Sequence, residues 1–211
     1  IKLAGKIQTT ELNIRREYFQ HLFLSLFYQQ EGMDSVYFKG GTALHLIYNN
    51  PRFSEDLDFD TDLRSIPAIE HLVVGTLAAI EKEGVETRLH EAKTTTGGYL
   101  AITDFTAQGH TTPIQLEISL RNGKKKEGTT AVVSSEFFPT YNLVQLEREL
   151  LIEGKMHALL ERYKPRDFYD FYFLLRANMI REKKREVFER VLVLQCLQQL
   201  TGLARPEPQH V

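Results

Sequence analysis

Hydrophobic residues return at helical spacing in the first part of the chain. Between residues 10 and 30 they recur every three or four positions, which predicts a helix that Thr10 caps and Gly32 ends. The β-branched and aromatic run at 35–38 is typical of a buried strand. Helical spacing then resumes over 42–50.

The middle of the chain alternates hydrophobic and polar positions, which is the pattern of strands. Alternation is strictest at 56–60, where Leu57 and Phe59 share one face and aspartates share the other. A helix is expected over 67–83, with a proline in its first turn. Further strands are predicted at 85–92, 98–107, 112–121 and 130–138.

Strand patterns end near residue 143, and helical spacing covers the rest of the chain. The predicted helices are 143–163, 166–177 and 181–200. We therefore expect an α+β fold with a mixed sheet, divided into an α/β core over 1–140 and a helical domain over 141–211.

Composition is that of an ordinary soluble domain. Hydrophobic residues make up 42% of the 211 positions and charged residues 26%, and the net charge of −2 gives no global attraction for nucleic acid. Cys196 is the single cysteine, which excludes an internal disulfide and a two-cysteine metal motif and fits a reducing compartment. The longest apolar runs are too short to cross a membrane. We expect a cytoplasmic protein that does not enter membranes.

Four aspartates occupy alternate positions after the second predicted helix: Asp56, Asp58, Asp60 and Asp62. Asp56 and Asp58 leave the same face of a strand about 6–7 Å apart, so their carboxylates can converge on a hard cation such as Mg²⁺. A calcium-binding EF-hand starting at Asp56 is excluded, because it requires glycine and glutamate where the chain has Thr61 and Pro67.

A third carboxylate is available on a later predicted strand. Glu117 lies among alternating apolar residues and completes a metal site if its strand neighbours the aspartate strand. Glu91 and Asp104 are the alternatives for this role. A half-solvated sheet with ordinary surface acids explains the same alternation equally well.

A glycine turn precedes the aspartates. Gly40 and Gly41 allow a close approach of the backbone to a phosphate at the start of a helix, and Thr42 adds a hydroxyl. Arg52 and Ser54 lie between this turn and the acids. A tight strand-to-helix turn that Thr42 caps is the structural alternative.

Together, "KGGTALHLIY" and "RFSEDLDF" resemble the signature of the AbiEii/AbiGii-type nucleotidyltransferases, toxins within the DNA polymerase β-like nucleotidyltransferase superfamily. The resemblance implies the superfamily's core fold, followed by a helical bundle. It implies triphosphate binding by Gly41 and Thr42, with Gly40, Arg52 and Ser54 nearby. It also implies binding of Mg²⁺ or Mn²⁺ by a set of three acids: Asp56, Asp58 and Glu117.

The segment "LLIEGKMHALLERYKPRDFYDFYFLL" is similar to the family's helical motif. By that resemblance Lys155 contacts the triphosphate and Asp167 is a further catalytic acid, accompanied by Arg166 and Asp170. An intrahelical Arg166–Asp170 salt bridge and a Lys155 stem lying along an apolar face are the structural alternatives. The aromatic residues are expected mainly in the helix core, although Tyr169 or Tyr172 could stack on a base.

The resemblance implies transfer of a nucleotide from an NTP to an acceptor. The expected acceptor is RNA, foremost the 3′ end of tRNA, or a protein hydroxyl. The expected setting is a toxin–antitoxin or abortive-infection system with a cognate antitoxin. Lys124, Lys125 and Lys126 could contact an RNA backbone or form a solvated loop. A non-catalytic nucleotide-binding module of the same fold is the alternative.

Overall fold

A computed structural model of the chain describes residues 9–120, 128–162 and 164–180. Two compact units divide the chain, the first reaching Leu151 and the second starting at Ile152. The described elements are α2 (Glu11–Phe27), a 3₁₀ turn (Met33–Ser35), β1 (Val36–Lys39), α3 (Gly40–Tyr48), β2 (Leu57–Thr61), α4 (Ile66–Lys82), β3 (Glu86–Thr95), β4 (Gly98–Ala107), β5 (His110–Leu120), β6 (Gly128–Val133), β7 (Tyr141–Leu146), α5 (Arg148–Arg162) and α6 (Pro165–Arg176).

The first unit is built on one seven-stranded sheet in the order β3-β4-β5-β2-β1-β7-β6. Strand β2 pairs antiparallel with β1 and parallel with β5, and β1 pairs parallel with β7. The sheet is therefore mixed, as predicted. The central strand β2 and its neighbour β1 carry the aspartates and the glycine turn.

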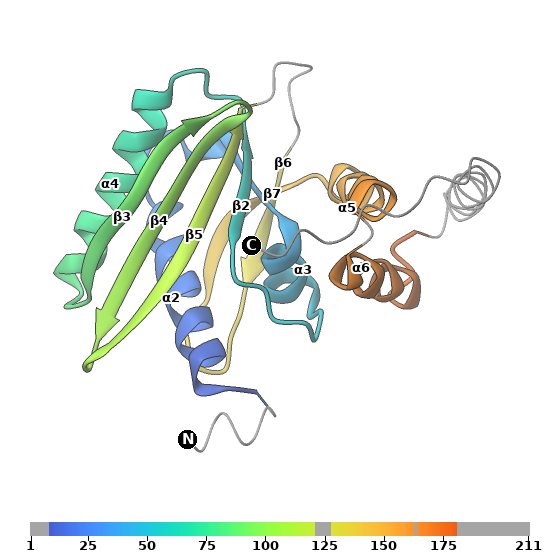
Figure 1. Cartoon of the computed structure of the whole chain (residues 1–211), viewed down its shortest axis with the longest axis horizontal. Coiled ribbons are helices and arrows are strands. Elements are labelled where there is room, and N and C mark those ends of the chain that lie inside the picture. Colours follow the sequence, from blue (N-terminus) through green and yellow to red (C-terminus); the bar gives the residue numbers. More distant parts are fainter. Residues whose placement is uncertain (1–8, 121–127, 163, 181–211) are drawn as a thin grey trace. The chain divides into compact units, whose positions relative to one another are not determined.

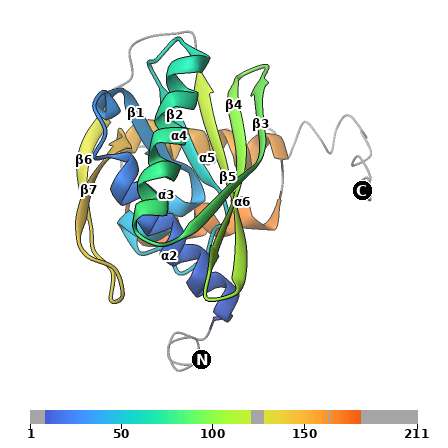
Figure 2. The same cartoon turned by 90° about the vertical axis from the view of Figure 1, so that its left-hand side faces the viewer.

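Helices α2 and α4 lie against the same face of the sheet (Figures 1 and 2). On this side the Phe27 ring of α2 lies 5.3 Å from Phe59 of β2, and Phe59 lies 5.4 Å from Phe38 of β1. All three phenylalanines are fully buried. Because side chains alternate along a strand, the acids between these apolar residues belong to the opposite face.

Helix boundaries follow the local signals in the sequence. The Thr10 side chain accepts a hydrogen bond from the Asn13 backbone amide at 3.1 Å and begins α2. Ser65 caps α4 in the same way, with Pro67 in its first turn. Both helices, the two longest of those described, lie where the spacing predicts them.

The region around residue 143 corrects the sequence prediction. Residues 141–146 form strand β7, and α5 begins only at Arg148, so the helix predicted from 143 is wrong in its first turn. Tertiary pairing overrides local propensity here, because β7 has β1 and β6 as neighbours. The Tyr28 hydroxyl also donates to the Val144 carbonyl at 3.0 Å.

Only part of the predicted C-terminal helical domain is described. Residues 152–162 of α5 and helix α6 make up the described elements of the second unit. The helix predicted at 181–200 lies outside the described residues. The helical bundle and the domain boundary at 140 therefore stay predictions. Within the described ranges, no helix is both long and apolar enough to cross a membrane.

Candidate nucleotide-transfer site

The acid face of the sheet brings Asp58 and Glu117 together. They are register partners on parallel neighbours β2 and β5, so their Cα atoms lie side by side on strands about 4.8 Å apart. On the other side of Asp58, its register partner is Lys39 of β1. Asp58 is half-buried and Glu117 is exposed, so the face remains accessible at both acids.

Asp60 and Asp62 each bond to a side chain of β1. Asp60 is buried and accepts a hydrogen bond from Lys39 Nζ at 2.5 Å, and Ser119 Oγ lies 3.4 Å from the same ammonium. Asp62 accepts from the Tyr37 hydroxyl at 2.8 Å. Burial raises the pKa of Tyr37 to about 12, and so do the hydrogen bond to Asp62 and its charge, so the hydroxyl keeps its proton and donates. Repulsion within the row of acids is therefore partly offset by Lys39.

The glycine turn packs directly on the acids. Gly40 has φ +86°, and an added Cβ would lie 2.8 Å from Asp58 Cβ and overlap its carboxylate. A Cβ on Gly41 would come within 2.6 Å of Arg52 Nη2 and 2.7 Å of Ser54 Oγ. Glycine is thus required twice, so that Asp58, Arg52 and Ser54 can approach the backbone at the start of α3.

Asp56 lies immediately before β2, and its carbonyl accepts a hydrogen bond from Thr42 Oγ1 at 2.5 Å. Thr42 is fully buried. Its hydroxyl thus ties α3 to the start of the aspartate strand, while a phosphate contact through this hydroxyl stays a prediction. The backbone N–H groups at the start of α3 are the other donors that this turn could offer to an anion.

The segment between α3 and β2, residues 49–56, is anchored from α2. The buried Gln20 side chain donates to the carbonyls of Ser54 and Glu55, both at 3.0 Å. Arg16 adds an ion pair to Glu55 at 3.3 Å. These anchors fix the backbone on which Arg52 and Ser54 face the glycine turn.

The three predicted metal ligands have donor atoms that suit a divalent cation, and the register brings two of them side by side. Carboxylate oxygens are the ligands that Mg²⁺ and Mn²⁺ prefer, and Asp58 and Glu117 are adjacent across two strands. In the described part of the chain, however, no three His, Cys, Asp or Glu side chains are grouped closely enough to hold a metal as they stand. Occupancy would require the carboxylates of Asp56, Asp58 and Glu117 to turn toward a common ion.

The register also separates Glu117 from its two alternatives. Asp104 on β4 aligns with Pro113, four residues along β5 from Glu117. Glu91 belongs to β3, the far edge of the sheet, and forms an ion pair with Lys93 at 2.5 Å. Glu117 is the acid of the three that the fold places beside Asp58.

The second unit holds its own charged pairs. Lys155 Nζ donates to Asp170 at 2.8 Å, and Arg162 lies 3.7 Å from Asp167. Both aspartates are buried, and Asp167 Oδ2 has no hydrogen-bond partner among the described residues. The triphosphate contact by Lys155 and the catalytic role of Asp167 stay predictions.

The aromatic residues of α6 differ from the sequence prediction. Phe168, Tyr169 and Tyr172 are exposed, so the placement expected for most of these aromatic residues, in the core, is wrong here. Base stacking by Tyr169 or Tyr172 stays a prediction. The helix buries Asp167, Asp170 and Leu174 instead, which sets its inward stripe. Arg176 lies over the Tyr172 ring.

Sequence reasoning did not identify Lys39 or Gln20. Lys39 directly precedes the glycine turn, and its position at the end of a buried strand is the available signal. Gln20 lies in an apolar stretch of α2, where a buried amide needs partners. Neither signal says which distant residue is the partner.

Comparison with known proteins identifies relatives of the chain. A family model described as "Nucleotidyl transferase AbiEii toxin, Type IV TA system" matches residues 22–207. No curated protein matches. Two similar solved structures are JHP933 from Helicobacter pylori and MenT4, a nucleotidyltransferase toxin from Mycobacterium tuberculosis.

Both structural matches have low sequence identity and cover most of this chain. JHP933 has 23% identity and a TM-score of 0.56, with 79% of this chain and 67% of that protein covered. MenT4 has 20% identity and a TM-score of 0.54, with 79% and 61% covered. Identities in this range indicate a shared fold, and the chain spans only about two thirds of either relative.

Proposed function

Because this chain belongs to the AbiEii nucleotidyl transferase toxin family, we propose that it transfers a nucleoside monophosphate from an NTP to an acceptor hydroxyl. One observation supports this proposal most directly. Asp58 is the register partner of Glu117, and it lies against the glycine turn. Acids and a glycine turn suited to binding an anion meet there, which is the arrangement that phosphoryl transfer needs.

The residues divide into two groups in this proposal. Backbone N–H groups at Gly41 and Thr42, together with Arg52 and Ser54, bind the triphosphate. The acids Asp56, Asp58 and Glu117 hold Mg²⁺ or Mn²⁺, which when bound neutralises phosphate charge and favours the ionised acceptor.

The reaction proposed here is a displacement at the α-phosphorus. The acceptor oxygen forms a new bond to that phosphorus, and the bond from phosphorus to the bridging oxygen breaks to release pyrophosphate. The proton of the acceptor hydroxyl passes to a base, and Glu117 is our candidate because it is exposed beside Asp58. Lys155 and Asp167, in the second unit, are proposed to contribute a triphosphate contact and a further acid.

For the acceptor we propose RNA, with the 3′ end of tRNA as the first candidate and a protein hydroxyl as the second. The support is the resemblance to nucleotidyltransferase toxins, and a type IV toxin implies a cognate antitoxin. A cytoplasmic setting, where NTPs and tRNA occur together, is part of the same proposal.

One observation favours the alternative of a non-catalytic nucleotide-binding module. The described acids are not gathered into a ready-made metal group. Such a module would bind NTP at the glycine turn without releasing pyrophosphate. The two functions therefore differ in a product that can be measured.

The test is incubation of the purified protein with each α-labelled NTP and total tRNA, with and without Mg²⁺ or Mn²⁺. We expect label to enter RNA with one NTP preferred, and equal amounts of pyrophosphate to appear. Binding of NTP without pyrophosphate release under any of these conditions would establish the non-catalytic module instead. Label on the protein fraction would identify a protein acceptor.

A further inference from the structure

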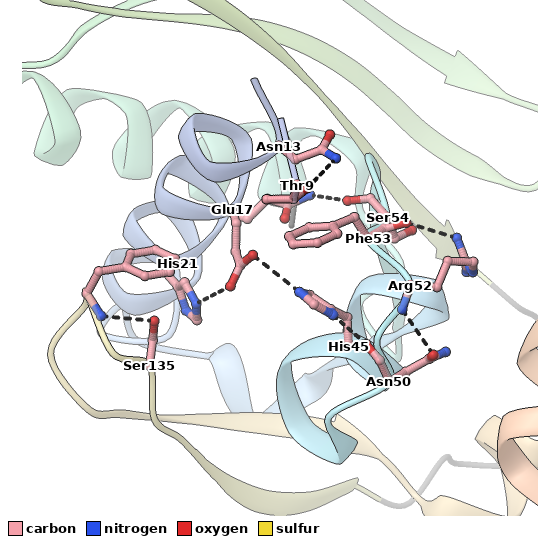
Figure 3. Close-up of polar contacts among 12 residues, drawn as sticks. Thr9, Asn13, Glu17, His21, His45, Asn50, Arg52, Phe53, Ser54 and Ser135 are labelled. Atoms are coloured by element: carbon pink, nitrogen blue, oxygen red, sulfur yellow. Dashed lines mark hydrogen bonds and ion pairs between the residues drawn. The ribbon is translucent and has the colours of Figure 1, made fainter. Parts of the chain in front are cut away.

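A largely buried polar cluster connects α2 to the segment that precedes the aspartates (Figure 3). Glu17 of α2 lies between two histidines: its carboxylate is 3.3 Å from His45 Nε2 of α3 and 3.7 Å from His21 Nε2. The Glu17 side chain is only 12% exposed. A carboxylate so enclosed requires positive partners to remain charged.

Both ring nitrogens of His45 face acceptors. Nε2 faces Glu17, and Nδ1 lies 2.6 Å from the backbone carbonyl of Asn50, which can only accept. Both bonds form together only when both nitrogens carry protons, which makes His45 an imidazolium ion. The charge on Glu17 and the proton on His45 therefore support each other.

His45 reaches the glycine turn through the 49–56 segment. Its ring lies 4.8 Å from the Phe53 ring, and it holds Asn50, whose Oδ1 accepts from the Arg52 backbone amide at 3.2 Å. Arg52 and Ser54 flank Phe53 in the sequence, and their side chains occupy the space that a side chain at Gly41 would need. A continuous chain of contacts thus runs from Glu17 to the nucleotide-binding turn.

We propose that Glu17 and protonated His45 are positioning residues for nucleotide binding, holding the 49–56 segment so that Arg52 and Ser54 face the triphosphate. This inference rests on the proposed function of the turn. It assigns the pair no contact with substrate. Its distinctive consequence is that nucleotide affinity depends on the protonation of His45.

The surrounding charges agree with this assignment. Burial alone would raise the pKa of Glu17, but the nearby rings of His21 and His45, with the hydrogen bond to His45, outweigh it and lower the pKa to about 2. Burial also opposes the charge on His45, as does nearby Arg52, yet Glu17 and the Asn50 carbonyl raise its pKa above 6.5. From the remaining side, His21 is held by the Tyr141 hydroxyl at 2.9 Å.

Steady-state kinetics with Glu17→Gln and His45→Gln test the proposal. Loss of one charge-assisted hydrogen bond at the anchor should raise KM for the NTP about tenfold, while kcat changes less than about threefold. Glu11→Gln, which removes the partner of Arg15 on the exposed side of the same helix, is the matched control and should leave both constants unchanged. Unchanged KM in both cluster variants would overturn the proposal.

The pH profile separates positioning from a general loss of stability. In the wild type, kcat/KM should fall on the alkaline side as His45 loses its proton. Glu17→Gln should move this limb to lower pH, and His45→Gln, which has no titratable ring, should lack it. An alkaline limb that stays in place in His45→Gln would contradict the inference, whatever the melting temperatures of the variants.

A nuclear magnetic resonance titration gives a readout besides activity. Both ring nitrogens of wild-type His45 should carry protons below its titration midpoint, and Glu17→Gln should lower that midpoint and shift the Gly41 amide. An unperturbed Gly41 amide would break the proposed connection. If the wild type transfers no nucleotide, the proposed function fails, while this titration still decides whether the cluster positions the turn.

Discussion

Asp58 on β2 and Glu117 on β5 are register partners on adjacent parallel strands, with Lys39 of β1 as the partner on the other side of Asp58. A row of one cation and two acids therefore crosses three central strands. Asp60 is bonded to Lys39 and Asp62 to Tyr37. Asp58 lies against the glycine turn, and Glu117 is exposed beside it.

Replacing either acid of this row should stop catalysis without unfolding the protein. Asp58→Asn and Glu117→Gln keep the side-chain size but remove a charge, so each should lower nucleotide transfer by at least about 10²-fold. Both residues retain solvent access, so stability should change by less than about 1 kcal/mol. Incorporation of α-labelled NTP and chemical denaturation measure the two effects.

Asp62→Asn is the matched control for these variants. Asp62 continues the same alternation, but its partner is the Tyr37 hydroxyl, to which an amide oxygen can also serve as acceptor. Transfer should stay near the wild-type rate. Equal loss in Asp62→Asn and Asp58→Asn would mean that the whole acidic row acts through its charge, and that Asp58 has no special position.

Gly40→Ala should disturb the site through a collision as well as through the backbone. The residue has φ +86°, and the new methyl group would overlap the Asp58 carboxylate. Displacement of a catalytic group by about 1 Å can cost about 10²-fold in rate. We expect that loss in the transfer assay, together with about 1–3 kcal/mol of destabilisation.

Gly84→Ala separates these two causes. Gly84 has a nearly identical φ of +83°, with no atom within 4 Å of an added Cβ. Its backbone strain should match that of Gly40→Ala, but transfer activity should be unaffected. If both variants lose activity equally, strain and not contact with Asp58 explains the requirement for glycine.

Local patterns predicted most of the fold. The alternation at 98–107 matches β4 in full. A capping threonine placed the start of α2, and a first-turn proline placed that of α4, each within a few positions. Strand β7 was missed because its six residues are defined by pairing with β1 and β6, which lie far away in sequence. Helical spacing continues from β7 into α5, so the sequence shows no local break.

The site was predictable to the extent that its residues are close in sequence. The glycines and aspartates lie in one short stretch, and their spacing there predicts that they belong to one site. The prediction that Glu117 lies beside Asp58 was conditional, because it depends on which strand lies beside β2. The anchors Lys39, Gln20 and Glu17 act through side-chain contacts across space, which a single sequence does not encode in any short pattern.

The Lys39–Asp60 pair should be a strong determinant of stability. Asp60 has a side chain only 3% exposed, so Lys39→Met would leave a buried carboxylate without this cation. We expect a loss of about 3–5 kcal/mol in the free energy of unfolding, measured with urea. Lys39→Met combined with Asp60→Asn should recover a large part of it.

Lys93→Met is the comparison for that measurement. Lys93 and Glu91 also lie 2.5 Å apart, but their side chains are 56% and 38% exposed. Loss of this surface pair should cost less than about 1 kcal/mol. Similar losses in Lys39→Met and Lys93→Met would show that burial of Asp60 carries no penalty.

Acid should weaken the protein partly through Glu17. Its pKa lies near 2 in the folded state against 4.5 ordinarily, since the two histidines outweigh the effect of burial. A carboxyl whose folded pKa is lowered stabilises the protein above its unfolded pKa and loses that contribution as the pH falls. Urea midpoints of the wild type should therefore decline between pH 4.5 and 2 more steeply than those of Glu17→Gln.

The difference between the two proteins isolates Glu17, because all other carboxyl groups titrate in both. On the alkaline side the sign is reversed: the pKa of His45 is raised, so its contribution is complete below its unfolded value and is lost as the pH rises through its folded pKa. His45→Gln should remove that alkaline decline while keeping part of the acid one, since His21 still faces Glu17. Parallel curves for wild type and Glu17→Gln across the acid range would mean that the carboxylate is no more acidic when folded, and that the histidines do not hold its charge.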